Sequence, residues 1–597
     1  MNNVLGGKKS KFKLYLLFVI FLIIILEYIS LKYSMVAIEY KKENIIEIVS
    51  KLFENIEKNA LDINFNDDVK NYFMKMQLFV IGAIAFILLL ASTSSMKKGE
   101  FSGSEYGSAT WAKADDLKKF KKNKKGIILG ENLYMDYTSK EYNLNQFIIG
   151  GPGSGKTFRK IKPDVMQANT NYVITDSKGE IFRDTSNYLR SKGYKIKVLN
   201  LIVPEYSMGF NPFKYIKDDK DVLILVDTFI NNTESDKSKQ STSNEGFWIK
   251  AETALMQALV FYVWKELPDY EWNFNTLLKL LLYASQDFTE EAATESLVIL
   301  DKIFNDLSIE NDRHEAVNCY KIFKLSGGQT STSIMIGLAV RFSIFISKDV
   351  ESLTREDEME LDLFANKDEK IALYIMISDS HRTFDVISAM FFSQLFQFLI
   401  YKADFEKGGS LDNHCRVLMD EFINIGFIPY FDTFLSTIRS RNISSTIILQ
   451  EITQLKTKYK DNWETIIGCC DTIIYLGSPA NETREYLSKI LGKTTVQQNN
   501  RSMNFGSKGG RSESVNNIQR DLLTPDELRV IGDEKQVVII RALKPIYLDK
   551  FKTEKKNYYK NLSDKADYKE VIKDEEELDF SKNIDIFEEL EKSSDLI

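Results

Sequence analysis

Two long apolar runs stand near the N-terminus, before any alternation of strands and helices begins. The first, LYLLFVIFLIIIL, starts at Leu14, and LFVIGAIAFILLLA, which starts at Leu78, forms the centre of the second. With their flanking residues, both approach the roughly 20 residues that a helix needs to cross a bilayer. The pattern therefore predicts membrane-spanning helices at about 14–31 and 74–94.

Charged residues around these runs indicate their orientation. Lysines precede the first run (Lys8, Lys9, Lys11 and Lys13) and follow the second (Lys97 and Lys98). By the positive-inside rule both ends lie in the cytoplasm, so the charged, weakly helical segment at about 39–73 lies outside. The first run also resembles a cleaved signal peptide. No small-x-small cleavage site follows it, and this favours a membrane anchor, which we place at residues 1–98.

From Asn145 onward, short apolar strands alternate with helical patterns. The predicted strands are Phe147–Ile149, Tyr172–Thr175, Ile196–Leu199, Ile371–Ile377, Val417–Met419, Thr446–Leu449, Ile473–Leu476 and Val537–Arg541. This alternation is typical of an α/β fold with a mostly parallel sheet and helices on both of its faces.

The strand pattern is interrupted between roughly Pro212 and Lys370. Helices are predicted there at Trp248–Lys265, Phe274–Tyr283, Glu290–Leu307, Asp312–Lys324 and Ser331–Ser347. The simplest interpretation is an all-α domain at 213–370, inserted into an α/β domain formed by 99–212 and 371–560.

Three further segments differ in composition. The segment 496–517 is rich in Gln, Asn, Ser and Gly and predicts a long loop or a weak hairpin. Leu117 to Lys125 carries six lysines, which suit a solvated loop, contact with anionic membrane lipid or, as a weaker option, nucleic acid. The acidic end, 561–597, is typical of a disordered tail, and such a tail can also recruit a basic partner.

Composition limits the classes of function. The 597 residues are too many for one compact core, so two or more domains are expected. A net charge of −7 excludes a globally basic nucleic-acid coat, and any nucleic-acid contact must be a local patch or a lined channel. The few cysteines have no metal-ligand spacing and suit a reducing compartment.

A glycine-rich segment directly follows the first predicted strand of the α/β domain. It comprises Gly150, Gly151, Pro152, Gly153, Ser154, Gly155, Lys156 and Thr157, the pattern G-x-x-x-x-G-K-[ST] of a phosphate-binding P-loop. Glycines let successive backbone N–H groups close on phosphate oxygens. Lys156 would reach the β- and γ-phosphates of ATP, and the Thr157 hydroxyl would bind Mg²⁺. The alternative is a Gly-rich surface turn, against which the preceding strand argues.

An acidic pair, Asp420 and Glu421, ends the predicted strand Val417–Met419. In P-loop nucleotide hydrolases the aspartate in this position holds Mg²⁺ through its water shell. The neighbouring glutamate can polarise the attacking water as a general base. Gln450 follows another strand and could sense the γ-phosphate or orient that water.

Two arginines, Arg439 and Arg441, lie between the acidic pair and Gln450. Arginines in this place could complete a neighbouring subunit's site across a ring interface. An exposed helix end with ordinary salt bridges is the alternative.

Five segments carry a pattern that is more specific than the P-loop itself. The longest is Met419–Ser478, which begins MDEFINIGFIPYFDTFLSTIRSRNISSTIILQ. The others are YVITDSKGEIF, GFWIKAETALMQAL, SDSHRTFDVISAMFFSQLF and RDLLTPDEL. Together these segments resemble TraG-type coupling proteins of conjugative type IV secretion systems. The resemblance covers most of the chain from Glu105 to about Tyr559, in the family's order, and the two predicted spans also fit it.

The resemblance implies a membrane-anchored, RecA-like ATPase that assembles as a homo-hexamer. Such a protein docks the relaxase-bound single DNA strand and drives it toward the proteins of the secretion channel. Carried over by position, Lys156 and Thr157 are the Walker A pair and Asp420 and Glu421 the Walker B pair. Gln450 matches the glutamine of the next motif, and Arg439 a trans-acting arginine.

Two further residues and two departures complete the comparison with the family. Asp176 and Lys178 lie in a family motif near the nucleotide. Ser177 stands where members commonly have proline, and Ile423 where they have alanine. Neither departure touches the proposed chemistry.

The leading hypothesis is therefore an ATP-hydrolysing DNA pump and substrate receptor at the cytoplasmic membrane. A second hypothesis is a substrate-docking receptor that uses ATP only as a conformational switch. A third is an FtsK-like DNA translocase. The acidic tail, and the lack of a basic winged-helix-like module at the C-terminus of the sequence, argue against the third.

Overall fold

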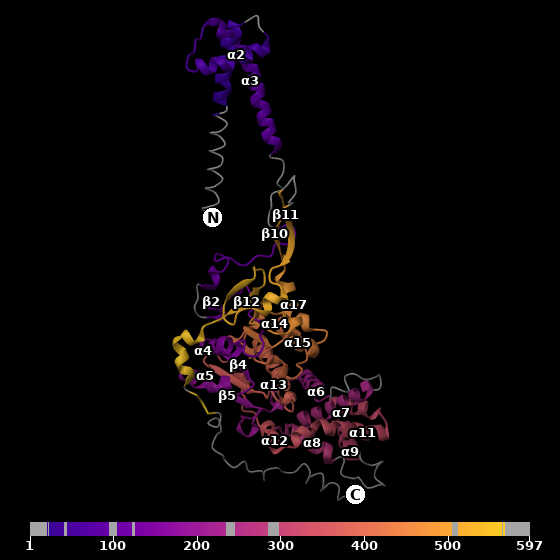
Figure 1. The fold of residues 1–597 in the computed structure, drawn as a ribbon. Coiled ribbons are helices and arrows are strands. Elements are labelled where there is room, and N and C mark those ends of the chain that lie inside the picture. The colour runs from indigo at the N-terminus through magenta and orange to yellow at the C-terminus, as the bar shows by residue number, and fades with distance from the viewer. Residues whose placement is uncertain are drawn as a thin grey trace, which may run out of the picture. The chain divides into compact units, whose positions relative to one another are not determined.

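The chain forms two compact units, Met1–Glu105 and Tyr106–Ile597, in the computed structural model (Figure 1). The structure describes residues 21, 23–40, 44–94, 104–121, 126–234, 245–283, 298–503, 511–563 and 565–567.

The first unit is helical. Residues 23–39 form a helix, followed by α2 (Ile45–Lys58) and α3 (Asp67–Ser94). The helix at 23–39 and α2 pack through a small apolar cluster that includes Val36 and Leu52. The buried ammonium of Lys32 donates hydrogen bonds of 2.6 Å to the carbonyls of Asn59 and Asp62, which ties the first helix to the turn before α3.

The predicted membrane spans fall partly outside the described residues. Of the span at 14–31, residues 14–20 and 22 lie outside them, as does 95–98 at the end of the predicted anchor. The span at 74–94 lies within α3. Among the described residues, the one helix that is long and apolar enough to cross a membrane is Asp385–Glu406, and 78% of its apolar window is buried inside the protein. That helix belongs to the core of the second unit and is neither of the two spans predicted near the N-terminus. Those two spans stay predictions.

A nine-stranded mixed sheet forms the centre of the second unit. Its order is β13-β12-β9-β3-β8-β7-β4-β6-β5. The strands are β3 (Gln146–Ile149), β4 (Asn171–Asp176), β5 (Lys195–Asn200), β6 (Ile371–Met376), β7 (Cys415–Met419), β8 (Ile443–Leu449), β9 (Thr472–Tyr475), β12 (Lys535–Ile540) and β13 (Ile546–Asp549). The seven strands from β9 to β5 are parallel, and β12 and β13 are antiparallel additions at one edge. All eight predicted strands are confirmed, and β13 is a strand that the sequence analysis missed.

Both faces of the sheet are covered, because successive side chains of a strand point to opposite sides. On one face Phe147 and Ile149 join a large core. The helices α13 (Asp385–Tyr401), α14 (Phe431–Thr437), α15 (Ile452–Lys458), α16 (Trp463–Gly468), α17 (Asn481–Leu491) and α18 (Pro525–Arg529) contribute to that core. On the other face Ile148 packs with α4 (Lys162–Met166), α5 (Glu180–Ser191) and the small hairpin of β1 (Ile127–Gly130) and β2 (Leu133–Met135). The fold is therefore α/β, as predicted.

Among the described residues, seven α-helices lie in sequence between β5 and β6, and these two strands are neighbours in the sheet. They are α6 (Asp219–Thr233), α7 (Glu245–Glu266), α8 (Phe274–Tyr283), α9 (Val298–Glu310), α10 (Glu315–Lys324), α11 (Gly328–Arg341) and α12 (Lys348–Arg355). Figure 1 shows α7, α8, α9, α11 and α12 gathered together, away from the hairpin of β10 (Lys493–Met503) and β11 (Arg511–Asp521) in the same unit. The sequence analysis missed α6, whose start is fixed by a capping box between Asp218 and Asp221. The exact domain boundaries stay predictions.

The polar segment predicted as a loop or a hairpin at 496–517 is a hairpin. Its strands are β10 (Lys493–Met503) and β11 (Arg511–Asp521), paired in register along their whole length. The residues that follow the first unit attach to its base, where Ser108 forms a bridge with Thr494 and the Tyr106 N–H donates to the Thr495 hydroxyl over 2.9 Å. Residues 122–125 of the lysine run and 568–597 of the acidic tail lie outside the described residues.

A buried group of three charges joins the helix after the P-loop to β7. The Asp164 carboxylate accepts from Lys160 and from Arg416, each at 2.9 Å, and from the backbone N–H of Ile128 at 2.9 Å. All three charged side chains are buried. Because isolated charges are costly in the interior, each member depends on the others.

Asp164→Ala is expected to destabilise the second unit by about 3–5 kcal/mol, because it leaves two buried cations without their carboxylate. Thermal and urea unfolding of the full-length protein measure this. Glu482→Ala is the control, since it removes the exposed partner of Lys456 and should cost less than about 1 kcal/mol. Equal losses in the two variants would contradict a stabilising role for the buried group.

Candidate nucleotide-binding site

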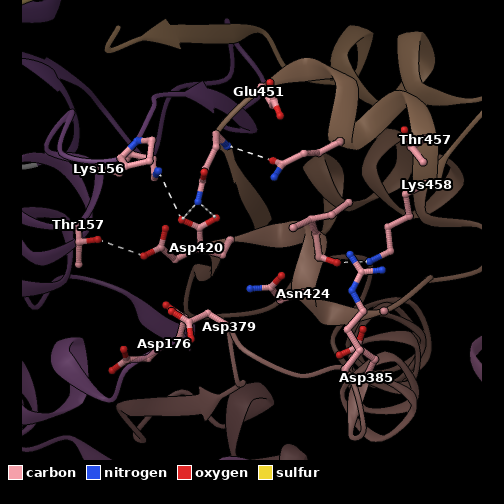
Figure 2. A pocket seen from close by; sticks show the side chains of 18 of the residues that line it. Lys156, Thr157, Asp176, Asp379, Asp385, Asp420, Asn424, Glu451, Thr457 and Lys458 are labelled. Carbon is pink, nitrogen blue, oxygen red and sulfur yellow. Dashed lines mark hydrogen bonds and ion pairs between the residues drawn. The ribbon is translucent and has the colours of Figure 1, made fainter. Parts of the chain in front are cut away.

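The predicted site residues meet at the carboxyl ends of the central parallel strands. In the sheet Ile149 is paired with Leu449, and Met419 with Ile447. The P-loop after β3, Gln450 after β8 and Asp420 after β7 therefore leave the sheet at the same edge. The P-loop, including Lys156 and Thr157, lines a cavity of about 1650 Å³ together with Asp420, Glu421 and Gln450. Figure 2 shows Lys156 and Thr157 on one side of Asp420, with Lys458 and Asp385 at the far end.

The backbone of the P-loop needs its glycines. Gly153 and Gly155 have φ of +75° and +90°, a region that side chains with a Cβ rarely adopt. A Cβ on Gly150 would lie 2.3 Å from the Ser154 hydroxyl oxygen. The loop is fixed at its start, where the N–H of Gly151 donates to the Gly477 carbonyl over 2.7 Å. This curled backbone is the form that directs N–H groups toward an anion.

Lys156 is buried between the P-loop and the acidic pair. Its ammonium donates to the Gly150 carbonyl over 2.8 Å and lies 3.4 Å from a carboxylate oxygen of Glu421. The cation is thus held where a phosphate bound to the loop would meet it.

Asp420 is a buried acid of the cavity with a strongly perturbed pKa. One carboxylate oxygen accepts from the Thr157 hydroxyl over 3.2 Å, and no donor among the described residues reaches the other, which is buried. The Thr175 hydroxyl fixes its backbone by donating to the Asp420 carbonyl over 2.6 Å. Burial, and then the neighbouring Glu421, raise the pKa of Asp420 to about 7, although Lys156 and Thr157 act in the opposite direction.

This donor set fits a magnesium ion. Mg²⁺ prefers hard oxygen ligands, and it commonly takes one or two protein groups together with phosphates and water. A buried carboxylate oxygen without a donor, beside a threonine hydroxyl, provides such ligands at the P-loop. Thr157 and Asp420 are the residues that would hold the ion.

Glu421 and Gln450 form a second polar pair beside the first. Glu421 has a left-handed backbone with φ of +49°, unusual for a residue with a Cβ. The Gln450 amide donates to both of its carboxylate oxygens, each over 3.2 Å. The carboxylate is therefore fixed between an amide and the Lys156 ammonium, with its orientation set from two sides.

Asp176 and Lys178 also line the cavity, but Asp176 has a structural task there. Its carboxylate accepts backbone N–H groups from Glu180 at 3.0 Å and Phe182 at 2.8 Å, and so caps α5. Burial raises the pKa of Asp176. Lys178 is exposed and lies 3.9 Å from Asp379.

The two arginines of the sequence analysis lie outside this cavity. Arg441 is held by Asp404 through two bonds of 2.8 and 2.7 Å, whereas exposed Arg439 donates to the backbone carbonyl of Lys140. Both precede β8, at the amino edge of the sheet, and the P-loop lies at the carboxyl edge. Neither arginine can reach the P-loop of its own chain.

The far wall of the cavity comes from residues that sequence reasoning missed. Asn232 of α6 exchanges two hydrogen bonds with the backbone of Phe427, of 2.6 and 2.8 Å. Lys458 donates to the Ile423 carbonyl. Burial raises the pKa of Asp385 to about 6, although Lys458 and Arg382 lower it. No local motif marks these residues, because their contacts depend on the packing of α6 against the loop after β7.

Comparison with known proteins identifies one family. The sequence model of the family described as "Type IV secretory system Conjugative DNA transfer" matches residues 105–582. The conjugal transfer protein TraG of Escherichia coli is 22% identical over 522 residues, which cover 77% of this chain and 76% of that protein. Protein VirD4 of Rhizobium radiobacter is 24% identical over 134 residues, 22% of this chain and 20% of VirD4.

Among solved structures, the plasmid coupling protein TrwB in complex with ADP and Mg²⁺ resembles this chain with a TM-score of 0.54. The two are 14% identical, and the likeness covers 76% of this chain and 97% of the TrwB chain. At this identity the likeness shows the fold alone, an α/β fold with a central mixed sheet.

Replacing Asp420 by its neutral isostere is expected to stabilise the metal-free protein at alkaline pH. An aspartate with a folded pKa near 7, against about 3.9 when unfolded, loses stability as pH rises from 4 to 7. The gain from Asp420→Asn should therefore grow by about 2–3 kcal/mol between pH 5 and pH 8. Thermal unfolding in EDTA, without nucleotide, measures it.

The matched control is Asp379→Asn, which neutralises a half-exposed carboxylate of the same cavity. Its effect should be small and similar at both pH values. A gain from Asp420→Asn that is the same at pH 5 and pH 8 would contradict the assigned perturbation.

Proposed function

Because this chain belongs to the type IV secretory system family for conjugative DNA transfer, as a coupling protein, we propose that it hydrolyses ATP and thereby drives DNA into the secretion channel. The observation that carries the proposal is the meeting of a P-loop lysine and threonine with an acidic pair and an amide in one cavity. A nucleotide-binding site alone would need only the first two.

ATP with Mg²⁺ is the ligand that we assign to the cavity. TrwB, which shares the fold, has been solved with ADP and Mg²⁺ and with a non-hydrolysable ATP analogue. Here the P-loop amides and Lys156 would hold the β- and γ-phosphates, and Thr157 and Asp420 the ion. Bound Mg²⁺ supplies charge neutralisation and in-line orientation of the phosphates.

Glu421 is assigned as the general base. It accepts the proton of the attacking water, while the two hydrogen bonds from Gln450 keep the carboxylate in one orientation. Lys156 offsets the negative charge that grows on the transferred phosphoryl group. A phosphate on the P-loop would also draw Lys156 away from Glu421, which frees that carboxylate for the water.

Arg439 is assigned to the site of a neighbouring subunit in a hexameric ring. It is exposed, lacks a carboxylate partner among the described residues and lies at the sheet edge opposite to the P-loop. A head-to-tail ring brings one subunit's amino edge toward the next subunit's carboxyl edge. Arg441 is less suited, because Asp404 already holds its guanidinium.

The proposal also assigns a membrane anchor and a cargo to this chain. The predicted spans at 14–31 and 74–94 would anchor the chain in the cytoplasmic membrane, with the α/β domain in the cytoplasm and the all-α insertion at 213–370 facing the cytoplasm. The cargo would be a single DNA strand with its bound relaxase, delivered to the proteins of the channel. A docking receptor that uses ATP as a switch is the second candidate, and hydrolysis distinguishes the two.

Lys156→Ala and Glu421→Gln are expected to reduce ATP turnover by at least about a hundredfold, the first through phosphate binding and the second through the chemical step. Both should abolish conjugative transfer, while Glu421→Gln still binds ATP. Turnover of the full-length protein and mating frequency are the measurements, with membrane fractionation as the control for insertion. Normal transfer by Glu421→Gln would favour the switch over the pump.

Mixing two inactive variants tests the ring and Arg439. Arg439→Ala and Lys156→Ala should each be inactive alone, since a trans-acting arginine is worth about 10³–10⁵ in turnover. In random mixed rings one site in four pairs an intact P-loop with an intact arginine, so a 1:1 mixture should recover roughly a quarter of the wild-type rate. Arg441→Ala, the control, should stay active alone. A mixture as inactive as its components would refute the assignment.

A further inference from the structure

A second lysine, Lys550, lies beneath the P-loop. It follows β13, the strand that the sequence analysis missed, and only 2% of it is exposed. Its ammonium donates to the Ser154 carbonyl over 2.9 Å and to the Leu476 carbonyl over 2.7 Å. Ser154 belongs to the P-loop, and Leu476 precedes the Gly477 carbonyl that holds the start of that loop.

Lys550 is a buried cation without a carboxylate in ion-pair range among the described residues. The charged groups that act on it are Arg159, Asp533 and Glu534, and Glu534 is already bound to Arg159 by two bonds of 2.6 Å. Other nearby carboxylates are engaged as well. Asp549 pairs with Lys535 and Lys552, and Glu131 with Lys556. Burial is the largest influence on the pKa of Lys550 and, with Arg159, lowers it to about 8.

The contact to Ser154 has a direct consequence for phosphate binding. A peptide group presents its N–H and its carbonyl on opposite sides, so a carbonyl drawn toward Lys550 leaves the N–H groups of the loop directed toward the cavity. The same C-terminal segment continues this support, since the Thr553 hydroxyl donates to the Phe158 carbonyl over 2.7 Å. A positive charge under the loop also attracts the anion above it.

We propose that Lys550 is a positioning residue of the nucleotide site. Lys550 holds the P-loop in its phosphate-binding form, and its buried positive charge is compensated by the phosphates of a bound nucleoside di- or triphosphate. The inference rests on the proposed nucleotide site. It assigns a role in nucleotide affinity to the segment after β13, more than 390 residues from the P-loop in sequence.

The charge of Lys550 gives the proposal a measurable sign. A bound polyanion favours the protonated lysine and so raises its pKa, which by linkage means that affinity falls as pH rises above the pKa of the nucleotide-free protein. With a free-state pKa of about 8, restored by nucleotide to the ordinary value of about 10.4, the Kd should rise about tenfold from pH 7 to pH 9.

The test measures the Kd of Mg²⁺-ADP by calorimetry on detergent-solubilised full-length protein at pH 7, 8 and 9. Lys550→Met should bind at least tenfold more weakly at pH 7 and lose the decline toward pH 9. Lys550→Arg keeps a charge that does not titrate in this range. It should bind within a few-fold of wild type at pH 7 and also show no decline. Lys552→Met, two residues away and without contact to the P-loop, should behave as wild type.

Two outcomes would overturn the inference. One is a wild-type Kd that does not change between pH 7 and pH 9, a result that needs no folded variant. The other is a decline in ADP affinity toward pH 9 that persists in Lys550→Arg. If Lys550 had only a structural role, its replacement by arginine would not change the pH dependence of the Kd. Lys156→Ala separates this inference from the site itself. If Lys156→Ala binds ADP with the wild-type Kd, the proposed nucleotide site is wrong. If Lys156→Ala loses ADP binding but Lys550→Arg keeps the wild-type pH dependence of the Kd, the nucleotide site stands and only the role of Lys550 is refuted.

Discussion

The parallel register of three neighbouring strands, β3, β8 and β7, is the constraint on which the candidate site depends. Because Ile149 pairs with Leu449 and Met419 with Ile447, the segments that follow these strands leave the sheet at one edge. Residues more than 260 positions apart, such as Thr157 and Asp420, thereby come within hydrogen-bond distance. A slip of one residue in either pairing would turn these side chains to the other face of the sheet.

The electrostatics of the cavity follow from that placement. Two adjacent carboxylates, Asp420 and Glu421, are brought into a poorly hydrated site, where burial and then the charge of Glu421 raise the pKa of Asp420. Lys156 partly offsets this charge, and Gln450 fixes the second carboxylate without adding charge. Such a site gains from a divalent cation and a polyphosphate together, since each compensates a charge that the protein leaves unbalanced.

Much of this arrangement could be predicted from the sequence, since it is encoded locally. The P-loop spacing, the apolar strand before Asp420 and the strand before Gln450 are short patterns, and the buried parallel strands appear as continuous apolar runs. Two features that the sequence did not predict depend on contacts between distant segments. The edge strand β13 has only four residues. Lys550 contacts the Ser154 carbonyl only because β13 pairs with β12, which places the residue after β13 beneath the P-loop. The pairing of Asn232 with Phe427 likewise requires α6 to pack against the loop after β7. The family resemblance points to Arg439 as the trans-acting arginine, and the structure adds that Asp404 holds the guanidinium of Arg441.

We propose that the edge formed by β3, β8 and β7 binds and positions a nucleotide for hydrolysis. The most direct measurement is a cryo-electron microscopy map of the full-length protein with saturating Mg²⁺-ADP. We expect phosphate density enclosed by the N–H groups of Gly153 and of Gly155 to Thr157, and an ion between Thr157 and Asp420. Nucleotide density elsewhere on the molecule, or an empty cavity at saturation, would contradict this account.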